Sequence, residues 1–145
     1  MGALGSGGHV VVNLDVVGPL HISQETLSEV VEAERCELLR RENRYRPGKP
    51  PPNVTGRTVI LVDDGMATGA SMRVAVEVVR ENRPQRLVVA VPVGSESACR
   101  QLMRLADDVV CVDVPSPLVA VGASYRDFDQ VSDAEVRRLL ESSIR

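Results

Sequence analysis

The second half of the chain alternates between two patterns of apolar and polar positions. Apolar runs of strand length occupy residues 58–63, 86–93 and 108–114. Apolar side chains at helical spacing occupy residues 69–82 and 95–106 between them. Strands and helices that alternate in this way predict right-handed βαβ units and a parallel sheet. Because the strands are apolar throughout and rich in β-branched valine, they favour a sheet covered on both faces.

The polar positions of these helices predict which sides face the core. The helix over 69–82 carries a single polar stripe, formed by Arg73, Glu77, Arg80 and Glu81. In the segment 95–106 we expect four residues to point inward: Ala98, Leu102, Met103 and Leu105. A last helix begins at Ser132, where Ser132 and Glu135 form a capping box. We expect that helix to bury Val136, Leu139 and Leu140.

The first part of the chain is less regular. Residues 9–13 (HVVVN) form a short strand candidate after a flexible Gly-Ser stretch. Ser23 caps a helix that runs to about Tyr45, with its acids early and its arginines late, an order that complements the helix dipole. Its charges are typical of a solvated face and include an i,i+4 pair between Glu37 and Arg41.

These patterns together predict one α/β domain over residues 1–145, with a parallel twisted sheet flanked by helices. Residues 1–56 would hold a flexible-loop region, the long helix and a proline-rich connector over 46–56. Residues 57–122 would form the parallel βαβαβ core, and residues 123–145 a tail with the C-terminal helix.

Composition narrows the function classes. The net charge of -3 argues against nucleic acid as a partner, because phosphate-backbone binding needs a basic surface. No apolar run approaches the ~18 residues of a membrane span. The three cysteines are widely spaced and fit reduced thiols in the cytoplasm, and the two histidines have no partners at metal-ligand spacing.

The most informative stretch is VILVDDGMATGAS (59–71), where an apolar strand stops on Asp63 and Asp64. The carboxyl ends of parallel strands are where such sheets bind ligands. Gly65 and Gly69 permit close approach of a ligand to the main chain. The backbone amides at the N-terminus of the following helix, which we call the helix mouth, favour a phosphate, and the hydroxyls of Thr68 and Ser71 can add hydrogen bonds to it.

The two carboxylates would repel that phosphate, so they need another target. Ionised carboxylates accept strong hydrogen bonds, and an adjacent pair suits the vicinal diol of a sugar. Phosphate and diol side by side describe a 5-phosphorylated ribose. If a bond at the anomeric carbon breaks, fixed negative charge would stabilise the cationic transition state. The plainer alternative is a strand-end turn in which Asp64 caps a helix.

This stretch resembles the phosphoribosyl-diphosphate-binding signature of the type I phosphoribosyltransferases. The resemblance extends over three further stretches: VVAVPVG (88–94), DDVVCVDVPSPLVAVG (107–122) and YRDFDQVSDAEV (125–136). These stretches are similar to bacterial phosphoribosyltransferase-domain proteins of unassigned substrate. It implies transfer of a phosphoribosyl group to or from a nitrogenous base. The partners it implies are phosphoribosyl diphosphate or a nucleoside monophosphate, with no nucleic acid and no membrane, in a cytoplasmic homodimer.

By this resemblance Asp63 and Asp64 are the catalytic acids that hold the ribose hydroxyls. The residues that wrap the 5-phosphate would be Gly65, Met66, Ala67, Thr68, Gly69, Ala70 and Ser71. Mg2+ would be carried in on diphosphate and ribose oxygens. Tyr125 and Phe128 follow the last strand, where relatives cover the base; they would stack on it, or Phe128 would fill the core beneath the last helix.

Two departures from the family pattern keep other functions open. Ala67 stands where some purine-using members carry a third aspartate, proposed as a base; uracil-type members also have alanine there, so Ala67 removes one candidate base without excluding transfer. Nothing before residue 9 resembles the strand and loop that bind diphosphate, so we expect a fold incomplete at its N-terminus. A non-catalytic sensor or regulatory subunit that binds phosphoribosyl diphosphate is therefore the alternative. A phosphoacceptor receiver domain is disfavoured, because it needs a late lysine and none follows Lys49.

Overall fold

The computed structural model describes residues 2–12 and 17–142. Its centre is a parallel sheet in the order β3-β4-β5, with strands β3 (Thr58–Val62), β4 (Arg86–Val93) and β5 (Asp108–Asp113). In the register Val62 lies beside Ala90, and Ala90 beside Val110. The predicted α/β class, the parallel sheet and the three strands are confirmed.

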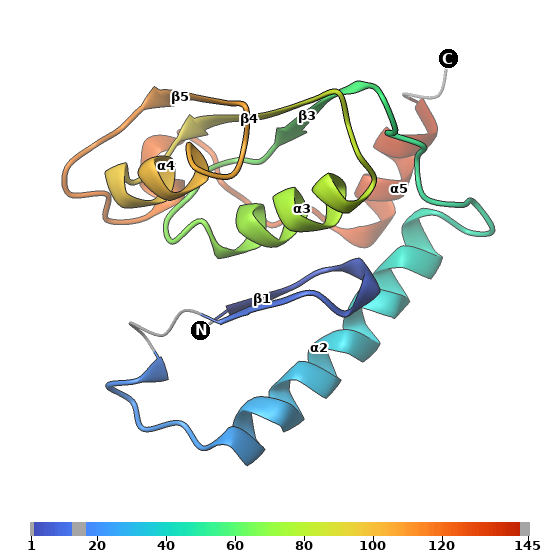
Figure 1. The fold of residues 1–145 in the computed structure, drawn as a ribbon, viewed down its shortest axis with the longest axis horizontal. Coiled ribbons are helices and arrows are strands. Elements are labelled where there is room, and N and C mark those ends of the chain that lie inside the picture. The colour runs from blue at the N-terminus through green and yellow to red at the C-terminus, as the bar shows by residue number, and fades with distance from the viewer. Residues whose placement is uncertain (1, 13–16, 143–145) are drawn as a thin grey trace.

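Helices α3 (Ala70–Glu81) and α4 (Glu96–Leu102), the N-terminal hairpin and the long helix α2 (Gln24–Tyr45) lie on one side of this sheet. Helices α3 and α4 connect the strands. Beyond α3 lies the hairpin of β1 (Gly2–Leu4) and β2 (Val10–Val12), and beyond the hairpin lies α2, as Figure 1 shows. A short 3-10 helix η2 (Val121–Ser124) and helix α5 (Asp133–Ser142) follow β5.

The N-terminal hairpin differs in part from the sequence-based prediction. The strand expected at 9–13 is present as Val10–Val12, while Asn13 lies outside the described residues. Strand β1 was not predicted, and it pairs antiparallel with β2. The segment expected to be flexible forms the turn: Gly7 and Gly8 have φ of 81° and 88°, a left-handed backbone that favours glycine.

The hydrophobic core lies between the sheet and the helices α3 and α4. Alternate residues of β4 are buried there, with Leu87 and Val89 at 0% exposure, and the inward residues of β3 and β5 are partly buried. They pack against Met72 and Val76 of α3 and against Leu102 of α4. We call this side of the sheet the covered face; its residues are Val59, Leu61, Leu87, Val89, Val91, Val109 and Cys111.

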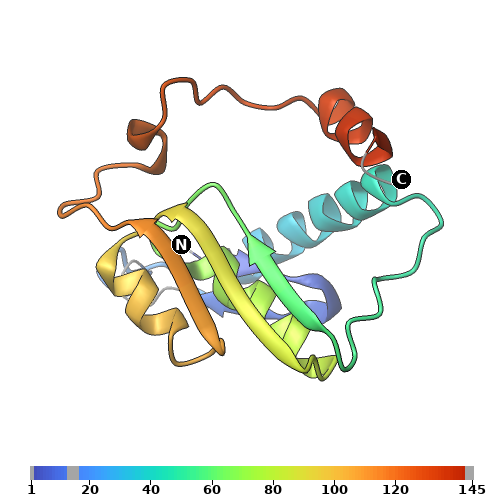
Figure 2. The same ribbon diagram turned by 90° about the horizontal axis from the view of Figure 1, so that it is seen from above.

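The opposite side of the sheet differs from the sequence-based expectation. It is formed by Ile60, Val62, Val88, Ala90, Pro92, Val110 and Val112, and we call it the open face. Val62 is 72% exposed and Val112 is 82% exposed. Figure 2 looks onto the strands, with α3 and the hairpin behind them. Within residues 2–12 and 17–142 the helices therefore cover one face, and the expected cover on both faces is not found.

The helix caps agree with the sequence-based prediction, but three positions that were expected to be buried are exposed. Ser23 Oγ accepts a hydrogen bond from the Thr26 N–H at 3.1 Å, and Ser132 Oγ accepts one from the Glu135 N–H at 3.3 Å. Met103 is 60% exposed because α4 ends one residue before it. Leu139 and Leu140, expected to be buried, are 52% and 42% exposed.

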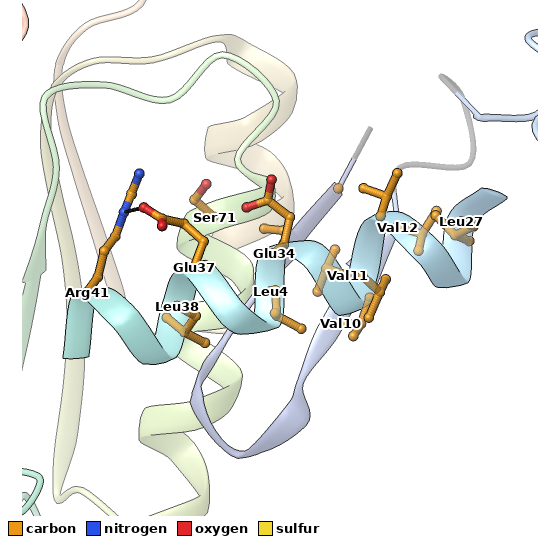
Figure 3. A pocket seen from close by; sticks show the side chains of 14 residues that line it. Leu4, Val10, Val11, Val12, Leu27, Glu34, Glu37, Leu38, Arg41 and Ser71 are labelled. Carbon is orange, nitrogen blue, oxygen red and sulfur yellow. Dashed lines mark hydrogen bonds and ion pairs between the residues drawn. The ribbon is translucent and has the colours of Figure 1, made fainter. Parts of the chain in front are cut away.

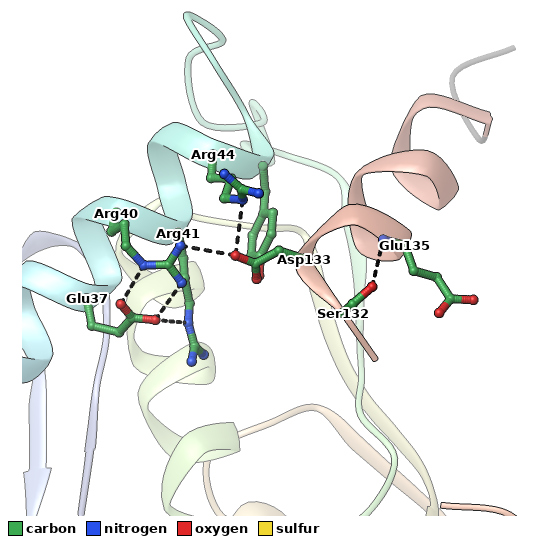
Figure 4. A network of polar contacts seen from close by, with 8 residues as sticks. Glu37, Arg40, Arg41, Arg44, Ser132, Asp133 and Glu135 are labelled. Atoms are coloured by element: carbon green, nitrogen blue, oxygen red, sulfur yellow. Dashed lines mark hydrogen bonds and ion pairs between the residues drawn. The ribbon is translucent and has the colours of Figure 1, made fainter. Parts of the chain in front are cut away.

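Asp133 forms the polar contact between α5 and α2 (Figure 4). Its carboxylate accepts hydrogen bonds from Arg40 Nη1 at 3.1 Å and Tyr45 Oη at 2.5 Å, and it lies 3.0 Å from Arg44 Nε. Glu37 organises the same stretch of α2 and accepts a bond from Arg41 Nε at 2.7 Å, as the i,i+4 spacing predicts. Among the described helices none is both long and apolar enough to cross a lipid bilayer.

Candidate functional site

The acid pair lies where β3 ends, at the carboxyl edge of the sheet. β3 stops at Val62, so Asp63 and Asp64 extend past the last strand residue, and both are exposed. The Asp64 N–H donates to Asp63 Oδ1 at 3.0 Å. The Asp64 carboxylate itself makes no hydrogen bond or ion pair within the described part of the chain, which leaves it open to an external donor.

The surroundings of Asp63 disfavour its charge. Although Asp63 is exposed to solvent, desolvation of its carboxyl by the surrounding protein atoms raises its pKa above the ordinary value of 3.8. The hydrogen bond from the Asp64 N–H lowers the pKa, and the neighbouring Asp64 charge raises it. Asp63 therefore takes up a proton at a higher pH than an ordinary aspartate. Hydroxyl or cationic donors at this position would relieve that penalty.

The turn that follows the acids is anchored to the end of β4. The Met66 N–H donates to the Val93 carbonyl at 2.9 Å, and the Met66 carbonyl accepts from the Ser95 N–H at 2.8 Å. The Met66 side chain is 2% exposed and belongs to the core. Ser95 Oγ donates to the Ala67 carbonyl at 2.7 Å, so one serine holds two points of the turn.

Beyond this anchor the chain opens into the mouth of α3. Gly69 is the N-cap residue with φ of 73°, in the left-handed region, and an added Cβ would meet Ala98 Cβ at 3.1 Å. The N–H groups of Thr68, Gly69, Ser71 and Met72 make no hydrogen bond within the described residues. Only the Ala70 N–H has a local acceptor, Thr68 Oγ1 at 3.4 Å. A helix mouth of this kind offers free amide donors and the positive end of the dipole.

The structure thus brings most of the predicted residues to one place. Asp63 and Asp64 lie on one side of the turn, and Thr68 and Ser71, both exposed, lie at the helix mouth. Gly69 and Ala70 are buried, so they can contribute backbone only. Within the described residues of the turn and the helix mouth there is no lysine or arginine apart from Arg73, one turn into α3.

The predicted aromatic pair lies against the acid turn. Tyr125 Oη donates to the Asp64 carbonyl at 2.6 Å. The Tyr125 and Phe128 rings are 5.1 Å apart between centroids and are tilted by 37°. Phe128 is 50% exposed, so it does not fill the core beneath the last helix. Whether either ring contacts a base stays a prediction.

Two contributors to this geometry were missed in the sequence. The sequence predicts Ser95 only as the start of a helix, although a serine at a helix start next to a strand end can bond the neighbouring turn. Val121 falls at the end of the predicted core range 57–122 with no role assigned to it, but its side chain packs on Gly65, where an added Cβ would lie 2.7 Å from Val121 Cγ1. No local pattern indicates that contact, because 56 residues separate the two positions in the chain.

A cavity of about 470 Å³ lies elsewhere, between the hairpin and α2 (Figure 3). Its walls are aliphatic, with Glu34, Glu37 and Arg41 at the edge, and Ser71 is the only residue of the 63–71 stretch that lines it. Arg41 is bonded to Glu37 and brings no free positive charge. The cavity therefore lacks the features of the acid pair and the helix mouth, and we do not assign the phosphate to it.

Comparison with known proteins agrees with the motif. Residues 17–126 match the family model described as phosphoribosyl transferase domain. A Mycobacterium tuberculosis protein named "Putative phosphoribosyl transferase" is 39% identical over 144 residues, which cover 99% of this chain and 32% of that protein. The "Bifunctional protein PyrR" of Chloroflexus aurantiacus is 34% identical over 97 residues, 66% of this chain and 52% of that protein.

A solved structure shares the same fold. The crystal structure of a Thermus thermophilus protein superposes with a TM-score of 0.75 at 42% identity and covers 97% of this chain. The match takes in 66% of that protein. The chain thus spans about a third of the mycobacterial relative and about two thirds of the solved one.

Proposed function

Because this chain belongs to the phosphoribosyl transferase domain family, we propose that it binds the ribose 5-phosphate part of phosphoribosyl diphosphate. In this proposal it transfers the phosphoribosyl group to or from a nitrogenous base. The family supports the transfer class, and the ligand and the residue roles are our assignment.

The observation that supports the proposal most is that a negatively charged group and a positively polarised group lie at the two ends of one short stretch. The acid pair of Asp63 and Asp64 lies at one end of the 63–71 stretch, and unpaired N–H groups with the positive end of α3 lie at the other. An anion binds at the helix mouth through amides. A group that donates hydrogen bonds binds at the acids. A ribose with a 5-phosphate carries both kinds of group in one small molecule.

The roles of the residues follow from this placement. The amides of residues 68–72 and the hydroxyls of Thr68 and Ser71 hold the phosphate. The carboxylates of Asp63 and Asp64 accept hydrogen bonds from the 2- and 3-hydroxyls. While the anomeric bond breaks, positive charge develops on the ring, and the same carboxylates stabilise it more than they stabilise the ground state.

Magnesium fits this donor set. Asp63 and Asp64 present exposed carboxylate oxygens, the ligand type that Mg2+ prefers. We expect the ion to arrive on the diphosphate and ribose oxygens of the substrate. When bound it neutralises the diphosphate charge, while the amides of the helix mouth bind the 5-phosphate.

Binding of ribose 5-phosphate to the purified chain tests the proposal directly. Titration calorimetry and ligand-induced thermal stabilisation should both detect binding. We predict that Asp64→Asn and Ser71→Ala each weaken binding by roughly threefold to tenfold, the range that one hydrogen bond supplies, with a larger loss if the bond involves charge. The melting temperature without ligand should not change, since both side chains are exposed and lie outside the core.

Matched substitutions separate a site effect from a general one. Asp129→Asn and Ser28→Ala make the same chemical changes at exposed positions in the tail and on α2. They should bind ribose 5-phosphate like the wild type. Unchanged affinity in both Asp64→Asn and Ser71→Ala would remove the proposed site.

Turnover separates the transferase from the sensor that the sequence left open. The purified chain is mixed with phosphoribosyl diphosphate, Mg2+ and a panel of purine and pyrimidine bases, and release of diphosphate is measured. Release that depends on the base and is lost in Asp64→Asn supports transfer. Binding of phosphoribosyl diphosphate without release for any base supports the non-catalytic sensor.

A further inference from the structure

The tail segment, residues 121–128, is fastened to the acid turn at two points. At the first, the Tyr125 hydroxyl donates to the Asp64 carbonyl at 2.6 Å. At the second, Val121 lies on Gly65, so close that an added Cβ would come within 2.7 Å of Val121 Cγ1. The segment therefore contacts the backbone of Asp64 and of the residue that follows it, at the point from which the acid side chains project.

The tail segment is itself held in shape. The Tyr125 N–H donates to the Gly122 carbonyl at 3.2 Å, which closes the η2 turn. Phe128 packs on Gly122, where an added Cβ would lie 2.7 Å from Phe128 Cδ1, and its ring lies 5.1 Å from that of Tyr125. The position of the Tyr125 hydroxyl is thus set by packing around its ring.

Both backbone polar groups of Asp64 are hydrogen-bonded. Its N–H is bonded to Asp63 Oδ1 at 3.0 Å, and its carbonyl is bonded to the Tyr125 hydroxyl. Its carboxylate, by contrast, makes no bond within the described residues. The fixed backbone limits the positions that the Asp64 carboxylate can reach, and the unengaged carboxylate stays available to a ligand.

From these contacts we propose that Tyr125 is a positioning residue that orients the Asp64 carboxylate toward the sugar diol and so sets the preference for ribose over deoxyribose. The proposal rests on the proposed function, since it concerns the same ribose 5-phosphate site. It differs from a base-stacking role, because the hydroxyl of Tyr125 makes the contact that matters and the ring only supports it.

The test compares two ligands in one protein. Ribose 5-phosphate and 2-deoxyribose 5-phosphate share the phosphate and differ by one hydroxyl of the diol. Their dissociation constants are measured by titration calorimetry on the full chain at one pH and salt concentration. The ratio of the two constants isolates recognition of the diol from recognition of the phosphate.

Tyr125→Phe removes one hydroxyl and keeps the ring. We expect the affinity ratio to fall toward one, through a loss of roughly threefold to tenfold for ribose 5-phosphate and no loss for the deoxy sugar. Tyr45→Phe is the matched control, because the Tyr45 hydroxyl bonds Asp133 in the contact between α2 and α5. It should keep the wild-type ratio. A base-stacking role alone predicts no effect of Tyr125→Phe, since the ring remains.

Each other outcome is decisive as well. A wild-type ratio in Tyr125→Phe overturns the positioning role and leaves the proposed function standing. Equal loss for both sugars also overturns it, because that pattern means a general loosening of the turn. If the wild type binds neither sugar, the proposed function fails and the positioning role fails with it. If Tyr125→Phe lowers the melting temperature, Phe128→Leu, which retains the hydroxyl, must preserve more of the ratio than Tyr125→Phe.

Discussion

The covered and open faces of the β3-β4-β5 sheet are both formed by aliphatic side chains, but only the covered face is buried. On the covered face Leu87 and Val89 are 0% exposed beneath α3 and α4. On the open face Val62 and Val112 are 72% and 82% exposed, although they come from the same three-stranded sheet. Burial of a large aliphatic side chain contributes about 1.5–3 kcal/mol, so the covered face stabilises the fold and the open face contributes little.

The difference shows what an apolar strand pattern encodes. A continuous apolar run predicts that both faces meet apolar surfaces, and it does not say which part of a protein supplies each surface. The described residues supply the apolar surface that covers one of the two faces, through helices α3 and α4. Contiguous exposed apolar residues are typical of an interaction surface. The predictions below test how far the two faces differ in solution.

The largest effect should come from truncating the covered face. We predict that Leu87→Ala lowers the free energy of unfolding by about 2–5 kcal/mol, because it leaves a cavity beneath α3 and α4. Ile60→Ala, on the open face of the neighbouring strand, should cost less than about 1 kcal/mol, since Ile60 is 60% exposed and only strand propensity changes. Urea unfolding at equal protein concentration measures both.

This pair also tests whether the open face stays open. A loss for Ile60→Ala as large as that for Leu87→Ala would mean that another surface covers the open face in solution. A loss that grows with protein concentration would identify that surface as a second copy of the chain.

A smaller effect is expected from adding a charge to the open face. Val112 lies on β5, an edge strand, where lysine is well tolerated. We predict that Val112→Lys changes the free energy of unfolding by no more than about 0.5 kcal/mol and lowers binding of a dye that reports exposed apolar surface. Val112→Ile is the control and should keep the dye signal. A destabilisation by Val112→Lys of several times that size would place Val112 in a contact.

The same division between local and distant causes explains what the sequence could predict. Strand β4 has the predicted bounds of 86–93, and α2 begins after the predicted cap at Ser23, because strand length and capping are local properties. Strand β1 escaped prediction because three residues rich in glycine and alanine have little strand signal without their partner β2. Met103 was misplaced because α4 ends earlier than its helical spacing suggests.

The candidate site divides in a similar way. The acid pair and the glycine turn were found from a contiguous stretch, since backbone freedom and helix-mouth amides depend on neighbours in sequence. The contacts that fix the stretch were not found. Ser95 reaches the Ala67 carbonyl from the end of the next strand, and Tyr125 reaches the Asp64 carbonyl across 61 residues of chain. Only the folded sheet brings these groups together.

The smallest predicted effect concerns α5, a second element whose apolar side chains are partly exposed and whose attachment is polar. The hydrogen bond from Tyr45 and the nearby Arg40 lower the pKa of Asp133 below its usual 3.8. A carboxyl with a lower pKa in the folded state than in the unfolded state stabilises the fold above about pH 4 and loses that contribution as the pH falls. Asp133→Asn should therefore lower the melting temperature slightly at pH 7, and its difference from wild type should shrink as the pH drops below about 4.

Asp129→Asn, at an exposed tail position, is the control and should show no difference from wild type at pH 7 or below about pH 4. A gap for Asp133→Asn that stays constant down to about pH 2 would mean that the α2–α5 contact does not depend on the Asp133 charge.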